Sequence, residues 1–193
     1  MMQKVVLASG NRGKLREMQQ VLGNAGLELL LQTDFDIIDA EETGKSFIEN
    51  AILKARHASA ATGLPALADD SGLCVDALDG RPGIYSARYS GENASDARNN
   101  EKLLKELASE DNRSASFICV LALVQHADDP LPLICEGRWR GEILREARGS
   151  NGFGYDPLFY IADLHCSSAE LEADVKNRHS HRGLALQQLL QRL

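Results

Sequence analysis

The sequence predicts an α/β fold, with one domain over residues 1–193. Strand-like apolar runs alternate along the chain with segments whose apolar residues recur at helical spacing, which is the pattern of α/β domains. Hydrophobic residues make up 44% of the chain, enough to bury a sizeable core. The sequence contains no internal repeat, low-complexity tract or interdomain linker. These observations favour a single domain, at most divided into two lobes.

A strand, a helix and a second strand are predicted at the start of the chain. The apolar run Val5-Val6-Leu7 is typical of a buried strand, and a helical pattern follows over about residues 14–24. A second apolar run at residues 27–31 predicts another strand. The acidic stretch at residues 34–42 shows no such pattern, so we expect it to be irregular.

An amphipathic helix is predicted over residues 46–62. Its apolar residues recur every three to four positions, and Ser46 followed by Glu49 matches the capping box that marks a helix start. A short buried strand at residues 65–68 comes next and leads into the turn-like segment 69–72. We therefore expect this strand to end at the two aspartates that follow it.

The second half of the chain predicts a helix, a long hairpin and two C-terminal helices. Glycine and proline punctuate residues 79–93 and residues 149–157, which predicts two loops. Two long apolar segments flank Asp128-Asp129-Pro130 and form the most hairpin-like part of the sequence. The predicted elements are a helix over 95–107, strands over 116–124, 131–143 and 158–161, and helices from about 168 and 180.

Charge and cysteine usage narrow the functional classes. The net charge of −7 argues against a nucleic-acid polymer as partner, because such proteins usually carry a basic face. A small nucleotide with a metal ion remains compatible with this charge. The four cysteines form no C-x-x-C pair, which favours reduced thiols over a zinc site or a disulfide framework. With no signal-like N-terminus and no apolar run near 18 residues, we expect a cytoplasmic protein without a membrane partner.

The turn after the first predicted strand has the features of an anion-binding site. It reads Ser9-Gly10-Asn11-Arg12-Gly13-Lys14. Glycines let the backbone approach a ligand, and the N–H groups and dipole of a helix start favour negative charge. A lysine in a first helical turn is unfavourable unless an anion lies beside it, which applies to Lys14. The alternative is an ordinary turn capped by Asn11 with a solvated Lys14, and the spacing is not that of a Walker loop.

Acidic residues near two strand ends predict a metal-assisted reaction. Side chains of adjacent residues in an extended chain point to opposite sides, so Asp69 and Asp70 should have different roles. One of them can bind a hard cation or activate water, while the other fixes backbone or a lysine. A second acidic pair, Glu41 and Glu42, and the nearby Lys54 favour a Mg²⁺ site over the alternative of a simple turn cap.

A basic cluster is predicted near the C-terminus. Ser180 matches a helix N-cap, which puts His181 and Arg182 in a first helical turn, and Lys176 lies shortly before them. Three basic groups at a positive helix end are plausible if they meet an anion or the polar edge of a base. His179 and His181 could instead be metal ligands, but two histidines without a third ligand motif are more often surface residues. The aromatic residues of the 149–157 loop offer a stacking face for a base, with simple packing as the alternative.

Seven motifs, in order and at compatible spacing, resemble the inosine triphosphate pyrophosphatase family, also known as the Ham1 or non-canonical purine NTP pyrophosphatases. The similarity extends over essentially the whole chain and is strongest to the bacterial branch. The motifs are Ser9-Gly10-Asn11 with Lys14 and Glu17, Glu42-Thr43-Gly44, Phe47-Ile48-Glu49-Asn50-Ala51 with Lys54-Ala55, Ala68-Asp69-Asp70-Ser71-Gly72-Leu73, Pro82-Gly83-Ile84-Tyr85-Ser86-Ala87-Arg88, Gly152-Phe153-Gly154-Tyr155-Asp156-Pro157 and Ser180-His181-Arg182-Gly183.

The resemblance implies a fold, an activity and a set of site residues. It implies an elongated α/β fold with a central mixed sheet and an active-site cleft between two lobes, a homodimer, and Mg²⁺-dependent hydrolysis of ITP, dITP, XTP and dXTP to the monophosphate and pyrophosphate. The implied catalytic residues are Asp70, Lys14, Asp69 and Lys54, and the implied metal ligands are Asp70 with Glu42 or Glu41, of which we favour Glu42. The implied substrate-binding residues are Ser9, Gly10, Asn11, Arg12, Gly13, Lys14, Ser71, Phe153, Gly154, Tyr155, Asp156, Lys176, His181 and Arg182.

Two other functions remain open at this point. One is a house-cleaning pyrophosphatase for other modified nucleotides, which would use related chemistry. The other is a non-catalytic module that senses a nucleotide. The carboxylates of Glu42 and Asp70 argue against the second, because a protein that only binds a polyanion has little use for them without a metal.

Overall fold

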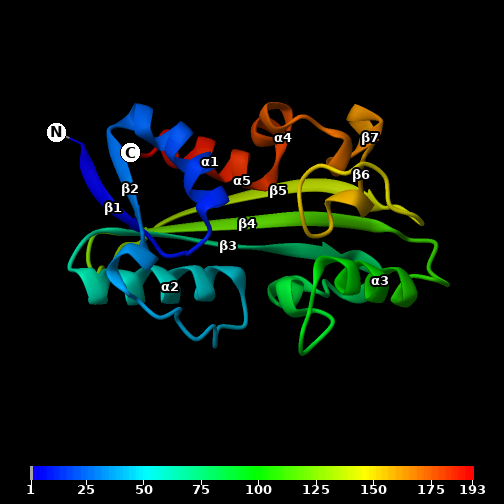
Figure 1. The fold of residues 1–193 in the computed structure, drawn as a ribbon, viewed down its shortest axis with the longest axis horizontal. Coiled ribbons are helices and arrows are strands. Elements are labelled where there is room, and N and C mark those ends of the chain that lie inside the picture. Colours follow the sequence, from blue (N-terminus) through cyan, green and yellow to red (C-terminus); the bar gives the residue numbers. More distant parts are fainter. Residues whose placement is uncertain (1) are drawn as a thin grey trace. The chain divides into compact units, whose positions relative to one another are not determined.

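The computed structural model describes residues 2–193 and has a mixed α/β architecture (Figure 1). Its helices and strands alternate along most of the chain. The strands are β1 (Gln3–Leu7), β2 (Leu27–Leu31), β3 (Ala66–Val75), β4 (Ser114–Val124), β5 (Leu133–Ile143), β6 (Phe159–Ile161) and β7 (Cys166–Ser167). The α-helices are α1 (Arg12–Leu22), α2 (Phe47–Thr62), α3 (Asp96–Glu106), α4 (Ala173–His179) and α5 (His181–Leu190).

The strands form one seven-stranded sheet in the order β2-β1-β3-β4-β5-β6-β7. β1 pairs in parallel with β2 and with β3, with Val5 opposite Leu29. β6 pairs antiparallel with both β5 and β7. The sheet therefore contains both kinds of pairing, and the predicted α/β fold with a mixed sheet is confirmed.

The chain divides into two compact units that are discontinuous in sequence. The first contains the residues up to Asp70 with Cys119–Gly137 and Leu184–Leu193, and the second contains Ser71–Ile118 and Arg138–Gly183. β3, β4 and β5 each contribute residues to both units. A single domain over 1–193 and a cleft between two lobes remain predictions.

The first unit has its own hydrophobic core. α1 and α5 lie on one face of its strands and α2 lies on the other (Figure 1). Buried side chains from both strands and helices meet in this core, including Leu7, Met18, Leu67, Leu121 and Leu189. Burial of these apolar side chains holds β1, which leads into the turn at residues 9–14, and β3, which contains Asp69 and Asp70.

The second unit has a separate core that is rich in aromatic side chains. The Phe159 ring lies 4.5 Å from that of Phe117 and 5.4 Å from that of Trp139, centroid to centroid, and both pairs are tilted. Leu103 and Leu107, at the C-terminal end of α3, are fully buried in the same cluster. This packing connects α3 to the sheet of the second unit.

The predicted boundaries are correct for several elements and wrong for others. β2 covers residues 27–31 as predicted, and α2 begins directly after the Ser46 cap. The strand expected to end before Asp69 instead continues to Val75, so both aspartates lie inside β3. Asp and Gly disfavour strands in isolation, but here the strand is buried and the aspartates bind lysines.

The C-terminal region also differs from the prediction. The helix expected from about residue 168 begins at Ala173, and residues 168–170 form a single 3₁₀ turn instead. The short strand β7 was not predicted. No helix within residues 2–193 is both long and apolar enough to cross a membrane. The four cysteines are free; Cys119 and Cys135 are buried, and Cys74 and Cys166 are half-buried.

Candidate active site

The turn between β1 and α1 is held by its own side chains. Asn11 caps α1, because its Oδ1 accepts from the backbone N–H of Gly13 at 2.8 Å and of Lys14 at 3.1 Å. Ser9 Oγ in turn accepts from the Asn11 N–H at 3.1 Å. Ser9 is half-buried, whereas Gly10, Asn11 and Arg12 are exposed. The Asn11 cap, which was part of the alternative of an ordinary turn, is present, and it occupies two of the N–H groups at this helix start.

Lys14 is paired with a carboxylate of its own chain. Its Nζ lies 2.6 Å from Asp69 Oδ1, and the Asp69 side chain is fully buried. The second carboxylate oxygen of Asp69 accepts from the Cys119 thiol at 3.3 Å. Both carboxylate oxygens of Asp69 therefore contact side chains of the chain itself, and Asp69 supplies the anion that a first-turn lysine requires.

Lys54 connects the second aspartate to the acidic segment before α2. Its Nζ donates to Asp70 Oδ1 at 2.6 Å, to Glu42 Oε1 at 3.0 Å and to the Asp69 carbonyl oxygen at 2.9 Å. Burial lowers the pKa of Lys54, but the carboxylates of Asp70 and Glu42 outweigh it and raise the pKa overall. The ammonium group therefore stays charged and holds two carboxylates together.

Asp70 has the environment of a reactive carboxylate. Burial raises its pKa; Lys54 opposes this, and the net shift is upward. Its Oδ2 is buried and has no hydrogen-bond partner. A buried acceptor without a donor is costly, so this oxygen is suited to binding a cation or a water molecule.

The carboxylates present fit a Mg²⁺ ion that takes most of its oxygen ligands from water and substrate. Within residues 2–193, no cluster of three or more His, Cys, Asp or Glu side chains could hold a metal ion. Glu42 and Asp70 supply two carboxylates that meet at Lys54. Mg²⁺ commonly takes one or two carboxylates and completes its shell with water and substrate phosphates. Glu41 is exposed and does not join the Lys54 cluster through any of the contacts described.

A second group of predicted residues meets around Asp156. Its Oδ2 accepts from the Phe153 N–H at 2.8 Å and forms a close ion pair with Lys176 Nζ, and its Oδ1 accepts from Ser168 Oγ at 2.8 Å. Lys176 Nζ also lies 5.0 Å from the centre of the Phe153 ring, which is 57% exposed. Gly152 is required here, since it has a positive φ and a Cβ would lie 2.1 Å from Asp156 Oδ2.

The two aromatic residues of this loop differ in exposure. Tyr155 is 4% exposed and its hydroxyl donates to the Ser86 carbonyl oxygen at 2.9 Å. The Tyr155 ring therefore packs in the core and offers no exposed face, which corrects the expectation that it adds to a stacking surface. Phe153 alone presents its ring to solvent.

The start of α5 carries the predicted basic pair. Ser180 Oγ accepts from the Gly183 N–H at 3.2 Å, as expected of an N-cap. His181 and Arg182 are both buried, and the His181 ring stacks on Phe117 at 4.8 Å. Both residues and Lys176 belong to the second unit, as does Ser71, the half-buried neighbour of Asp70 on β3.

Comparison with known proteins identifies the family. The model of the Ham1 family matches residues 5–192, which is nearly the whole chain. The chain belongs to the Ham1 family. Its relatives include a dITP/XTP pyrophosphatase of Photorhabdus laumondii, 58% identical over all of this chain and 98% of the relative. A dITP/XTP pyrophosphatase of Vibrio cholerae is 57% identical over 97% of this chain and 95% of its own.

Solved Ham1 structures share the fold. A HAM1 protein from Coxiella burnetii superimposes with a TM-score of 0.95 at 54% identity, covering 98% of both chains. The Ham1 protein of Staphylococcus aureus gives a TM-score of 0.90 at 41% identity and covers 98% of this chain and 97% of its own. The fold described above is therefore the Ham1 fold.

Sequence reasoning gave no role to several side chains that bind residues of the candidate site of this Ham1 protein. Asn50 is fully buried, and its Oδ1 accepts from the Gly44 N–H at 2.8 Å, close to Glu42 in sequence. Cys119 and Ser168 bind the two site aspartates Asp69 and Asp156. Asn50 could have been recognised, since it lies four residues before Lys54 and hence on the same helix face. The other two depend on contacts between residues distant in sequence.

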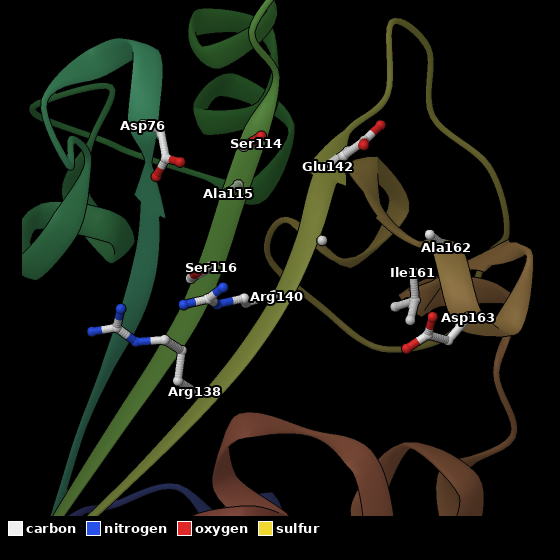
Figure 2. A pocket seen from close by; sticks show the side chains of 11 residues that line it. Asp76, Ser114, Ala115, Ser116, Arg138, Arg140, Glu142, Ile161, Ala162 and Asp163 are labelled. Atoms are coloured by element: carbon white, nitrogen blue, oxygen red, sulfur yellow. The ribbon is translucent and has the colours of Figure 1, made fainter.

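A cavity of the Ham1 protein is lined by residues of the second unit alone. Its volume is about 480 Å³, and Figure 2 shows Arg138 and Arg140 of β5 projecting into it. The other lining residues include Asp76, Glu142 and Asp163, so both signs of charge are present. No predicted site residue lines this cavity, and the candidate site is defined by its hydrogen bonds and ion pairs.

Proposed function

We propose that this Ham1 protein hydrolyses non-canonical purine nucleoside triphosphates, dITP, ITP, XTP and dXTP, to the monophosphate and pyrophosphate and so cleanses the nucleotide pool. Relatives that match it over nearly their whole length are named dITP/XTP pyrophosphatases. The observation that carries the proposal is the Lys54 cluster, in which a buried Asp70 keeps one carboxylate oxygen without a partner. A protein that only sensed nucleotides would have no need of such a group.

Asp70 is proposed as the proton acceptor. Lys54 holds Asp70 Oδ1, which leaves Oδ2 to orient a water molecule and take its proton as the water attacks the α-phosphorus. Glu42 and Asp70 are the carboxylates that would hold Mg²⁺. When bound, Mg²⁺ supplies positive charge that offsets the charge building on the phosphates.

The β1–α1 turn is proposed to bind the triphosphate. Since Asn11 already binds the N–H groups of Gly13 and Lys14, the amides of Gly10 and Arg12 are the better candidates for phosphate contacts. Lys14 has three N–H donors, and the pair with Asp69 uses one. Its remaining donors are proposed to hold phosphate oxygens.

The cluster around Asp156 is proposed to recognise the base. Phe153 has the exposed ring on which a purine would stack. Hypoxanthine and xanthine carry a carbonyl at C6, so a fixed donor from Lys176, His181 or Arg182 would favour them over adenine. A second donor or a close wall near C2 would reject the amino group of guanine. Opposed or unpaired buried polar groups give discrimination of roughly 10⁴-fold.

The remaining proposals concern assembly and location. We propose a homodimer that acts in the cytoplasm, on the strength of the family resemblance. Sedimentation equilibrium should then give about twice the 21.1 kDa chain mass. A mass of one chain at enzyme-assay concentrations would contradict the homodimer.

The decisive experiment is a substrate profile. Pyrophosphate release is measured for ITP, dITP, XTP, GTP, ATP and the pyrimidine triphosphates, with Mg²⁺ and with Mg²⁺ chelated. We expect release from the first three, little from the others, and none after chelation. Preference for a pyrimidine or a methylated nucleotide would instead favour a different house-cleaning pyrophosphatase. Binding of ITP without turnover would indicate a sensing module.

A further inference from the structure

Both backbone polar groups of Gly154 are bound by α3. The Gly154 N–H donates to Asp96 Oδ2 at 2.7 Å, and the Gly154 carbonyl oxygen accepts from Asn100 Nδ2 at 2.9 Å. Asp96 is the first residue of α3 and Asn100 lies four positions later, so the two side chains share one face of the helix. Gly154 itself has a φ of +61°, a conformation that suits glycine.

This attachment restrains a loop that has little regular structure. Residues 150–155 form bends and turns, and residues 149–153 are exposed. On its C-terminal side the loop is held by Asp156, which accepts from the Phe153 N–H. The α3 contacts fix the next residue, Gly154, so the backbone on both sides of the Phe153 side chain has a defined direction.

Ser86 connects the residue that follows Gly154 to α3 and β3 through hydrogen bonds. The Tyr155 hydroxyl and Asn99 Nδ2 both donate to the carbonyl oxygen of Ser86. Ser86 Oγ accepts from the Leu73 N–H of β3 and donates to the Gly83 carbonyl oxygen. The motif that contains Ser86 thus connects α3, β3 and the loop, although it contributes none of the predicted site residues.

We propose that Asp96 is a positioning residue for nucleotide recognition: by holding the Gly154 amide, with Asn100 on the Gly154 carbonyl, it fixes the direction in which Phe153 presents its ring. The proposal rests on the proposed function, since the ring has a base to stack on only if the protein binds a nucleotide. Without the hydrogen bonds from Asp96 and Asn100, the glycine-containing loop would have to become ordered when the nucleotide binds. The lost conformational entropy of the loop would oppose binding. The proposed reaction residues Asp70 and Lys54 lie outside this loop, so the loss falls on binding.

The test compares Asp96→Ala with Ser95→Ala. Ser95 caps α3 by accepting from the Arg98 N–H and has no described contact with Gly154, so its loss weakens the helix start alone. For Asp96→Ala we expect the KM for ITP to rise about fivefold, and for Asp96→Ala with Asn100→Ala about tenfold or more, with kcat within about twofold of wild type. Asp96→Asn keeps an acceptor and should restore a KM within about twofold of wild type.

A second readout is independent of activity. Hydrogen exchange of the Gly154 amide, followed by NMR without nucleotide, should be faster in Asp96→Ala and unchanged in Ser95→Ala. Equal KM values in the two variants, or unchanged Gly154 exchange in Asp96→Ala, would overturn the positioning role. A wild-type protein that releases no pyrophosphate from ITP would contradict the proposed function, and the exchange measurement would still decide whether Asp96 holds the loop.

Discussion

Asp69 and Asp70 are consecutive residues with separate partners. Asp69 is fully buried between Lys14 and the Cys119 thiol, so its two oxygens hold other side chains. Asp70 binds Lys54 through one oxygen and keeps the other without a partner. The alternation of side chains along β3 explains the difference, because adjacent residues of a strand point to opposite faces. At the residue scale, this separates a structural carboxylate from the proposed proton acceptor.

Asp70→Asn is expected to abolish turnover. The amide keeps the size of the side chain but cannot accept the proton of the attacking water and adds no charge to a Mg²⁺ site. The rate should fall by at least about 10²-fold. Steady-state pyrophosphate release from ITP measures this effect. Near-normal turnover by the folded variant would contradict the role of Asp70.

The same variant should fold at least as well as the wild type near neutral pH. Burial raises the folded-state pKa of Asp70 above its unfolded value, so the folded protein binds this proton more tightly. The contribution of Asp70 to stability is therefore present below the unfolded pKa and is lost as pH rises through the folded pKa. Asparagine cannot ionise, so the variant does not lose this stability as the pH rises. Thermal denaturation at neutral pH should show an equal or higher Tm for Asp70→Asn.

At the scale of elements, α2 organises an irregular segment. Residues 37–46 form no helix or strand, yet Glu42 within them reaches Lys54. The Ser46 cap starts α2, and the side-chain oxygen of Asn50, the fourth residue of the helix, accepts from the Gly44 N–H. Lys54 follows Asn50 by four residues, so both side chains lie on one face of α2. Through Asn50 this face binds the backbone of the 37–46 segment, and through Lys54 it binds the Glu42 carboxylate.

Asn50→Ala is expected to raise the Mg²⁺ concentration that the enzyme requires. Without Asn50, the Gly44 N–H loses its acceptor and Glu42 is held less firmly at Lys54. We expect a loss of about 1–3 kcal/mol in the free energy of unfolding and a severalfold higher Mg²⁺ concentration for half-maximal activity. Denaturant unfolding and Mg²⁺ titrations of pyrophosphate release measure the two effects.

Ser46→Ala is the matched control for Asn50→Ala. It removes the cap that accepts from the Glu49 N–H and should cost about 1 kcal/mol of stability. Its Mg²⁺ requirement should stay near that of the wild type, because the Asn50–Gly44 bond remains. If both variants shifted the Mg²⁺ requirement equally, Asn50 would act through helix stability alone.

At the scale of the whole molecule, each unit has its own hydrophobic core within residues 2–193, and the strands β3, β4 and β5 belong to both units. Because β3, β4 and β5 each continue from one unit into the other, unfolding of these strands in one unit disrupts them in the other. The two units are therefore expected to unfold together. The prediction that residues 1–193 form one domain thus means that they unfold in a single cooperative transition.

Phe159→Ala tests this cooperativity. The side chain is fully buried and packs on Phe117 and Trp139, so its removal should cost about 3–5 kcal/mol. Fluorescence of Trp139, the one tryptophan of the chain, reports on the second unit, and far-UV circular dichroism reports on all helices and strands. We expect the two denaturation curves of the variant to coincide at a lower midpoint. A Trp139 transition that precedes the dichroism transition would show that the units unfold separately.

The sequence by itself determined the features that depend on near neighbours. The apolar run at residues 27–31 and the Ser46 cap predicted β2 and the start of α2 correctly, because strand and cap patterns lie within a few residues. The Ser180 cap was predicted for the same reason, and the Asn11 cap belonged to the alternative for the first turn. The ordered motifs also predicted the family, which the family model confirms.

Only the tertiary structure decided which side chains meet. Lys14 and Asp69 are 55 residues apart, and their pairing showed that the anion beside this lysine belongs to the chain itself. The continuation of β3 through both aspartates depends on buried surroundings and lysine partners that no local pattern contains. Whether Phe153 or Tyr155 presents its ring was likewise decided by packing against distant residues. Local patterns record the preferences of short segments, whereas burial and ion pairing depend on residues brought together by the fold.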